Sequence, residues 1–122
     1  MATKRRAFIT GLSGTKLLDE ERAFLREAQP FGLILFKRNV EDKAQVTELV
    51  AEALSELAPE ALVLVDQEGG RVQRFGPPHW PAYPPGAVFG KIYDQDPKKG
   101  IAAAWLGARL MAADLLPMGI NT

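Results

Sequence analysis

The stretch Ala61-Leu62-Val63-Leu64-Val65-Asp66-Gln67-Glu68-Gly69-Gly70-Arg71 decides the fold, because an apolar run ends abruptly in a polar, glycine-containing loop. A short, continuously apolar run suits a β-strand that is covered on both faces. Gly32-Leu33-Ile34-Leu35-Phe36 is a second run of this kind, and Ala7 to Leu12 reads as an earlier strand. The sequence therefore predicts three strands, of which the two continuously apolar ones are expected to be buried, and the last runs directly into Asp66.

Helical patterns lie between and after these strands. The first helix is expected to begin at Asp19 as its N-cap and to end before Pro30. The second, from about Asp42 to Leu57, is the clearest amphipathic helix in the chain. Prolines crowd residues 77–85 and forbid a regular helix or central strand there. A long helix is then expected from about Pro97 to Leu116.

Strands that alternate with helices imply parallel pairing and right-handed crossovers. The long helix should bury an apolar stripe, and Ile120 to Thr122 looks like the start of a further strand. The stripe consists of Ile101, Ala104, Trp105, Ala108, Met111 and Leu115. Two architectures fit the alternation of strands and helices. One is a doubly wound open sheet, and the other is about three and a half units of a (β/α)8 barrel, which needs about 250 residues when complete. We expect the polypeptide to continue beyond Thr122, the alternative being a small open sheet.

Composition excludes several classes of protein. Fifteen Lys and Arg balance fifteen Asp and Glu, so no basic field points to nucleic acid or an anionic membrane. The absence of cysteine leaves no disulfide frame, thiolate metal site or thiol nucleophile. The basic start from Met1 to Arg6 precedes an apolar run too short for a secretory signal, which indicates a mature cytosolic amino terminus. No segment is expected to supply the roughly 20 apolar residues of a membrane span.

The candidate site follows the third strand, at the edge where parallel α/β folds bind ligands. An ionised Asp66 accepts hydrogen bonds and can hold two neighbouring sugar hydroxyls, although it could instead only cap the turn. Arg71 and Arg74 are permanent donors, one of which is expected to tie the loop to an acid. Asp66 with Glu68 could also hold Mg²⁺. A phosphate cradle at the glycine pair is disfavoured, because no nucleotide-binding glycine pattern is present.

Three ring-bearing residues lie in the proline-rich loop. His79, the only histidine, is expected to pack at the surface rather than to act as a general base. Trp80 and Tyr83 could form a wall for a sugar face, but we expect them to cover the end of the core.

The strand ends also carry a resemblance. Gly32 to Asn39 and Val65 to Phe75, which includes Asp66-Gln67-Glu68-Gly69-Gly70-Arg71-Val72-Gln73-Arg74, closely resemble the bacterial β-N-acetylhexosaminidases of glycoside hydrolase family 3. Leu110 to Asn121 resembles that family's entry into its next strand, so the match spans nearly the whole chain.

The resemblance implies that residues 1–122 are an incomplete amino-terminal part of a (β/α)8 TIM-barrel domain, monomeric and cytoplasmic. It implies a retaining hydrolase of peptidoglycan recycling that removes non-reducing N-acetylglucosamine from muropeptides without a metal or other cofactor. It assigns Asp66 and Arg74 to substrate binding and leaves Arg71 as a structural partner of the loop.

One departure from the family limits this assignment. The family's aspartate nucleophile and its histidine acid/base belong to motifs that do not occur in this sequence. Retaining hydrolysis needs both an attacking carboxylate and a proton donor. We therefore expect part of a sugar site, no catalytic residue, and no activity in the 122-residue chain itself. The alternative is a non-catalytic sugar-binding α/β protein.

Overall fold

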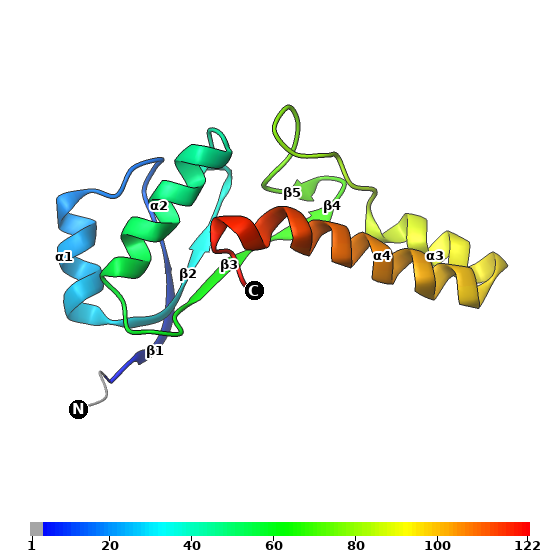
Figure 1. Ribbon diagram of the computed structural model, residues 1–122. Coiled ribbons are helices and arrows are strands. Elements are labelled where there is room, and N and C mark those ends of the chain that lie inside the picture. The colour runs from blue at the N-terminus through cyan, green and yellow to red at the C-terminus, as the bar shows by residue number, and fades with distance from the viewer. Residues whose placement is uncertain (1–3) are drawn as a thin grey trace.

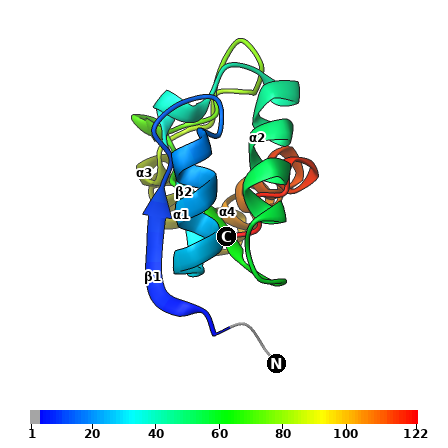
Figure 2. The same cartoon turned by 90° about the vertical axis from the view of Figure 1, so that its left-hand side faces the viewer.

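The computed structural model describes residues 4–122, so the first three residues of the basic start lie outside it. Its body is a parallel sheet of three strands in the order β1 (Arg6–Gly11), β2 (Pro30–Leu35) and β3 (Leu62–Val65). The crossover helices α1 (Asp19–Ala28) and α2 (Lys43–Ser55) lie side by side along this sheet (Figures 1 and 2). The predicted α/β order and parallel pairing are confirmed.

The face of the sheet under α1 and α2 forms the core. Thr10, Leu33 and Val63 are register partners, so their side chains point to this same face. Leu33 and Val63 are at most 1% exposed. The helices contribute the other side of this core: Leu25, Val46, Leu49, Val50 and Ala53. The apolar positions of the amphipathic pattern are therefore the ones that pack on the sheet.

The opposite face of the sheet is not covered by α1 or α2. Gly11, Ile34 and Leu64 are register partners on this face, one residue out of phase with the core positions. Its carboxyl-terminal end is where the loops after the three strands meet, and it positions the candidate site.

Local signals set the ends of the two helices, with one correction. Asp19 is the first helical residue rather than the N-cap, which is Leu18. Glu21 instead satisfies the N-cap, because its carboxylate accepts a hydrogen bond from the backbone N–H of Leu18, and it also accepts one from Ser13 in the preceding loop. These bonds outweigh the effect of burial and lower the pKa of Glu21. Asp42 does cap α2, accepting from the N–H of Gln45.

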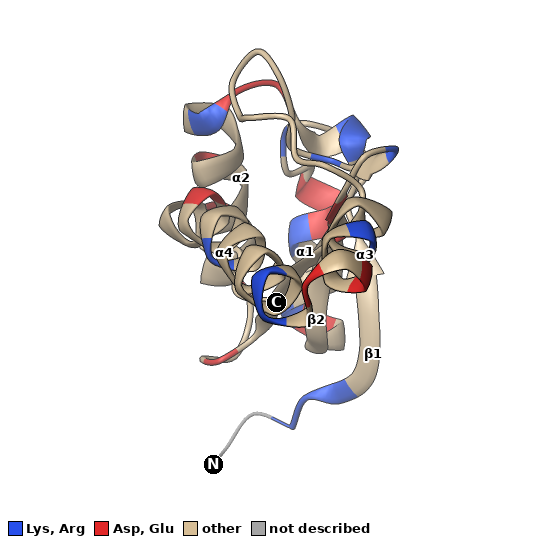
Figure 3. Ribbon diagram, turned by 90° about the vertical axis from the view of Figure 1, so that its right-hand side faces the viewer, with Lys and Arg blue, Asp and Glu red and all other residues tan. Residues whose placement is uncertain are grey.

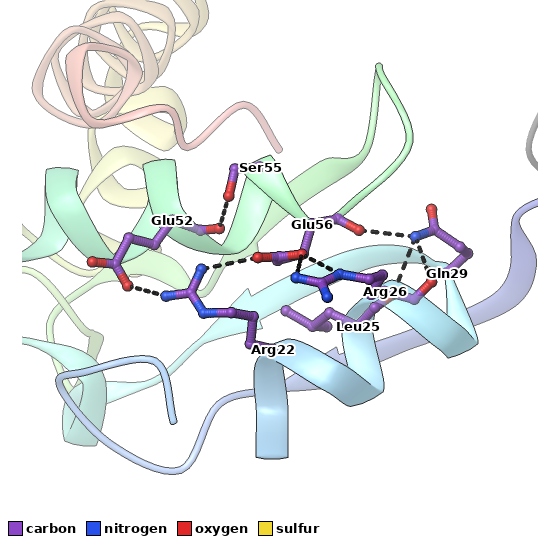
Figure 4. A network of polar contacts seen from close by, with 7 residues as sticks. All are labelled: Arg22, Leu25, Arg26, Gln29, Glu52, Ser55 and Glu56. Carbon is purple, nitrogen blue, oxygen red and sulfur yellow. Dashed lines mark hydrogen bonds and ion pairs between the residues drawn. The ribbon is translucent and has the colours of Figure 1, made fainter. Parts of the chain in front are cut away.

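Ion pairs join α1 to α2 on their outer side (Figure 4). Arg22 donates to Glu52 and Glu56, each over 2.9 Å, and Arg26 also donates to Glu56. The hydrogen bonds from Arg22 and Arg26 lower the pKa of the Glu56 carboxyl. The glutamates of the polar face of α2 therefore hold the neighbouring helix and are not only solvated.

After β3 the structure contains elements that the sequence pattern did not predict. Strands β4 (Gln67–Gly69) and β5 (Val72–Gln73) form a small antiparallel hairpin, turned by Gly69 and Gly70 at positive φ. The proline-rich loop follows without a helix or strand, as predicted. Helix α3 (Gly86–Gln95) then precedes α4 (Pro97–Leu115), which ends in the 3-10 turn η2 (Leu116–Met118).

Helices α3 and α4 form an arm that extends away from the sheet and returns to it at Leu115 (Figure 1). Two glycines of α4 allow α3 and α4 to approach each other closely. A β-carbon built at Gly100 would lie 2.4 Å from the Cα atom of Tyr93, and one at Gly107 would lie 2.8 Å from the ring of Phe89. The contacts that join α3 to α4 therefore require glycine at these two positions.

The stripe expected to be buried on α4 is mostly exposed, which corrects the sequence prediction. Ile101 is 62% and Trp105 is 64% exposed, whereas Leu115 is buried. The physical reason is that α3 is a short helix and meets α4 along its glycines rather than along this stripe. Figure 3, seen from the end of the arm, shows that charged residues occupy little of α4.

Helix α4 with η2, Pro97–Met118, is also the one helix of the described chain that is long and apolar enough to cross a membrane, by length and composition only. The expectation that no segment reaches this length is therefore wrong. Core helices of soluble proteins pass the same test of length and composition, whereas 17% of the apolar window of this helix is buried.

The last residues run beside β3, as expected for a further strand, but without forming a regular one. The N–H groups of Asn121 and Thr122 donate to the carbonyl of Val63, and the N–H of Val65 donates to Thr122. The Asn121 side chain accepts from the N–H of Val63. Residues 121 and 122 thus continue the hydrogen bonding of the sheet beyond β3.

Candidate functional site

The candidate site lies at the carboxyl-terminal ends of the strands, on the face that α1 and α2 leave uncovered. Asp66 directly follows β3, and the alternation of β3 turns it to the same face as Leu64. The hairpin that follows brings Arg74 back beside it: Nη2 of Arg74 lies 3.1 Å from Oδ2 of Asp66. The two residues assigned to substrate binding are therefore in direct contact.

The pair is half-buried and keeps unused hydrogen-bonding capacity. The side chain of Asp66 is 42% exposed and that of Arg74 is 28% exposed. Among the described residues, Oδ1 of Asp66 accepts no hydrogen bond, so one carboxylate oxygen is available to a ligand. The Nε of Arg74 is buried without a partner. Arg74 thus fixes one oxygen of Asp66 and leaves the other to accept from a hydroxyl.

Gln67 is a supporting residue that sequence reasoning missed. Its Oε1 accepts from the backbone N–H groups of Arg74 and Phe75, and its Nε2 donates to the Phe75 carbonyl. Gln73 plays a similar part, donating to Phe75 and Pro81. Both glutamines belong to the segment from Asp66 to Arg74, but their partners lie across a hairpin that no residue pattern predicted.

The glycine pair is required by close contact with the proline-rich loop. A β-carbon built at Gly69 would lie 2.2 Å from the carbonyl oxygen of Pro84, and one at Gly70 would lie 2.8 Å from Pro85. The N–H of Gly70 donates to the carbonyl of Tyr83. The glycines therefore allow the loop to pack over the hairpin.

Arg71 does not have the structural part expected of it. Its side chain is exposed and makes no ion pair or hydrogen bond within residues 4–122. Arg74 is the arginine that ties the loop to an acid. Glu68 is also exposed, and no group of three or more metal-binding side chains gathers in the described chain.

Of the two aromatic residues expected to cover the core, Trp80 does so, whereas Tyr83 is bonded to α4 and is not part of the core cluster. Trp80 is 3% exposed and packs edge-on against the buried Phe75, with ring centroids 4.9 Å apart. His79 is exposed beside Trp80. The hydroxyl of Tyr83 donates to the carboxylate of Asp114 on α4. Burial and this bond raise the pKa of Tyr83 to about 12, so the contact persists through the neutral range.

A second arginine reaches the same face from the loop after β2. The guanidinium of Arg38 lies over the ring of Phe36, 4.8 Å from its centroid, and that of Arg74 lies 5.8 Å from the same centroid. The loop is fixed by the fully buried Asn39, which donates to the carbonyls of Leu12 and Gly14. Its polar residues directly after a buried strand were the signal that could have identified Arg38.

A carboxylate–guanidinium pair at the carboxyl-terminal ends of parallel strands occupies the edge at which α/β folds, barrels among them, place their ligand sites. No family model matches the chain. A "Beta-hexosaminidase" of Xanthomonas axonopodis pv. citri (strain 306) is 41% identical over 113 residues, which cover 93% of this chain and 34% of that protein.

Solved structures give the same relationship. NagZ from Neisseria gonorrhoeae in complex with N-trifluoroacetyl-D-glucosamine is 34% identical, with a TM-score of 0.88 over 95% of this chain and 35% of that one. A glycoside hydrolase family 3 β-N-acetylglucosaminidase from Paenibacillus sp. str. FPU-7 is 28% identical, with a TM-score of 0.79 over 93% of this chain and 21% of that one.

The chain is therefore homologous to the β-hexosaminidases of glycoside hydrolase family 3 and has the fold of the amino-terminal part of their barrel domain. It spans about a third of the length of the curated relatives that it matches. The predicted fold class is confirmed, and the barrel is covered only in part.

Proposed function

We propose that this chain supplies part of the sugar-binding site of a retaining β-N-acetylhexosaminidase. The enzyme would release non-reducing N-acetylglucosamine from muropeptides, as a cytoplasmic monomer in peptidoglycan recycling. The similarity to β-hexosaminidases and to a NagZ that binds a glucosamine derivative supports the class of substrate. The observation that carries the proposal is the contact between Asp66 and Arg74 at the end of β3.

In this proposal the pair holds the sugar and does not break its bond. The free Oδ1 of Asp66 accepts a hydrogen bond from a ring hydroxyl, while the Arg74 guanidinium orients the carboxylate through Oδ2. Interactions that tighten as the ring distorts toward the transition state raise kcat. The nucleophile and the acid/base would come from sequence motifs that this chain does not contain.

A chimera tests the proposal. Residues 1–122 are joined to the remaining part of the Xanthomonas relative, and hydrolysis of an aryl β-N-acetylglucosaminide is measured together with the anomeric form of the released sugar. We expect activity with a β product from the chimera and none from the 122-residue chain alone. A folded chimera with no activity would contradict the enzyme and favour a sugar-binding protein.

Asp66→Asn in this chimera tests the site itself. Loss of an ionised acceptor for buried hydroxyls should lower kcat/KM about 100-fold, because a hydrogen bond to a charged group contributes about 1.5–3 kcal/mol. Glu68→Gln, an exposed carboxylate of the same motif, is the matched control and should change kcat/KM less than about threefold. Equal effects of the two substitutions would refute the role of Asp66.

A further inference from the structure

The guanidinium of Arg38 is held over the end of the sheet by three features. Its Nε donates to the carbonyl of Leu12 over 2.9 Å, and its plane lies over the ring of Phe36. The absence of a side chain at Gly11 makes room for it, since a β-carbon built there would lie 3.0 Å from Nη2 of Arg38. A long surface arginine needs none of these restraints to remain solvated.

The position places Arg38 in the same space as the Asp66–Arg74 pair. Gly11 belongs to the uncovered face of the sheet, so the guanidinium above it lies on that face. Arg38 and Arg74 both stand against the ring of Phe36. The loops after β1, β2 and β3 thus converge on one polar cluster at the carboxyl-terminal edge.

The charges of this cluster do not balance. Arg74 is paired with Asp66, but within residues 4–122 no carboxylate lies within ion-pair distance of Arg38. Nη1 and Nη2 of Arg38 likewise donate to no atom of the described chain. Its one used donor, Nε, orients the plane, and the outer edge of the guanidinium keeps the two parallel donors that bind a carboxylate bidentately.

We propose that Arg38 forms a carboxylate subsite beside the sugar site, so that the protein selects glycosides that carry an acidic group. The subsite deepens the proposed function and rests on it. The sugar is held through Asp66 and Arg74, and a carboxylate of the same ligand binds the free edge of Arg38. A neutral ligand of the same shape leaves this edge to water and binds more weakly.

The test uses two matched ligands and the 122-residue chain. They are 4-carboxyphenyl N-acetyl-β-glucosaminide and its neutral 4-carbamoylphenyl analogue, titrated into the ¹⁵N-labelled chain while the arginine Nε–Hε and backbone signals are followed by NMR. We expect both ligands to shift the signals of Asp66 and Arg74, and only the carboxylate to shift Arg38. The carboxylate should bind about tenfold more tightly than the amide, in low salt.

Two variants separate Arg38 from general surface charge. Arg38→Gln should bring the ratio of the two dissociation constants close to one, whereas Lys37→Gln, which removes the neighbouring exposed cation, should leave it within about twofold. Dispersed amide signals matching the wild type show that each variant is folded. The comparison of ligands in the wild type remains decisive if Arg38→Gln does not fold.

The outcomes distinguish the two proposals. Equal affinity for acid and amide, or a ratio unchanged by Arg38→Gln, would overturn the subsite while leaving the sugar site intact. A shift at Arg38 without any shift at Asp66 or Arg74 would support an anion site and contradict the proposed sugar site. No shift with either ligand would contradict both.

Discussion

The body and the arm of this molecule cover their apolar surfaces to different extents. In the body, formed by β1 to β3 with α1 and α2, Leu33 and Leu35 are at most 1% exposed. In the arm, formed by α3 and α4, Ile101 and Trp105 are more than 60% exposed, and the helices meet along glycines. The core between the sheet and its two helices is therefore closed by contacts within the chain, whereas the arm presents apolar surface that the described residues do not cover.

This difference matters for the site, because the site belongs to both regions. Asp66 and Arg38 project from the body and Arg74 from the β4–β5 hairpin, but the loop that packs over Gly69 is bonded to the arm through Tyr83 and Asp114. The same loop is bonded to the hairpin, because the N–H of Gly70 donates to the carbonyl of Tyr83 and Gln73 donates to that of Pro81, so it links the site to the arm.

The largest expected effect is a loss of stability in the core of the body. Leu35→Ala removes a fully buried side chain between the sheet and its helices. Loss of transfer free energy and the remaining cavity should lower the free energy of unfolding by about 2–5 kcal/mol. Leu106→Ala is the matched control, because Leu106 on α4 is 53% exposed. This substitution should change the free energy of unfolding by at most about 0.5 kcal/mol. Urea denaturation followed by circular dichroism measures both, and equal losses would refute the contrast.

An intermediate effect is expected within the arm. Gly100→Ala forces a β-carbon against the backbone of Tyr93, which cannot move away as a side-chain tip can. We expect about 1–3 kcal/mol of destabilisation, confined to α3 and α4. Hydrogen exchange should therefore accelerate in residues 86–110 and stay unchanged in the three strands.

Gly90→Ala is the control for this substitution. A β-carbon at Gly90 meets nothing within 4 Å, and alanine is the better helix former by about 1 kcal/mol. It should slow exchange in α3. Acceleration by both substitutions would mean that any change of backbone entropy, rather than the clash at Gly100, loosens the arm.

The same division separates what the sequence predicts from what it does not. Continuous apolar runs predicted β2 and β3, and three- and four-residue spacing predicted α2, because these patterns record the burial of a segment by its neighbours. The pattern on α4 was equally clear, yet Trp105 is exposed. Periodicity shows which face can be buried but not which partner covers it.

The candidate site shows a similar limit. The position of Asp66 after a buried strand was readable from local order. Its contact with Arg74 depends on the β4–β5 hairpin, which is too short to show alternation. The approach of Arg38 depends on the register of β1 with β2, and the bond from Tyr83 to Asp114 joins residues 31 apart. Such contacts are set by tertiary packing and produce no periodic pattern in the sequence.

The smallest effect concerns the outer surface of the body and its dependence on pH. The hydrogen bonds from Arg22 and Arg26 lower the pKa of Glu56 below its ordinary value of 4.5. A lowered folded-state pKa stabilises the protein above the unfolded pKa, and this contribution is lost as the pH falls through the folded value. Glu56→Gln should therefore lower the urea midpoint slightly at pH 7, by an amount that shrinks once the pH drops below about 4.5.

The shape of this difference identifies its cause. Glu21 also has a lowered pKa, so the wild type and Glu56→Gln should both lose stability in acid, and only the gap between their curves reports on Glu56. The gap should narrow further in high salt, because the Arg22 and Arg26 side chains are partly exposed to solvent. A gap that stays constant from pH 7 to pH 3 would assign the effect of the substitution to packing of the side chain and leave no part for the ion pairs between α1 and α2.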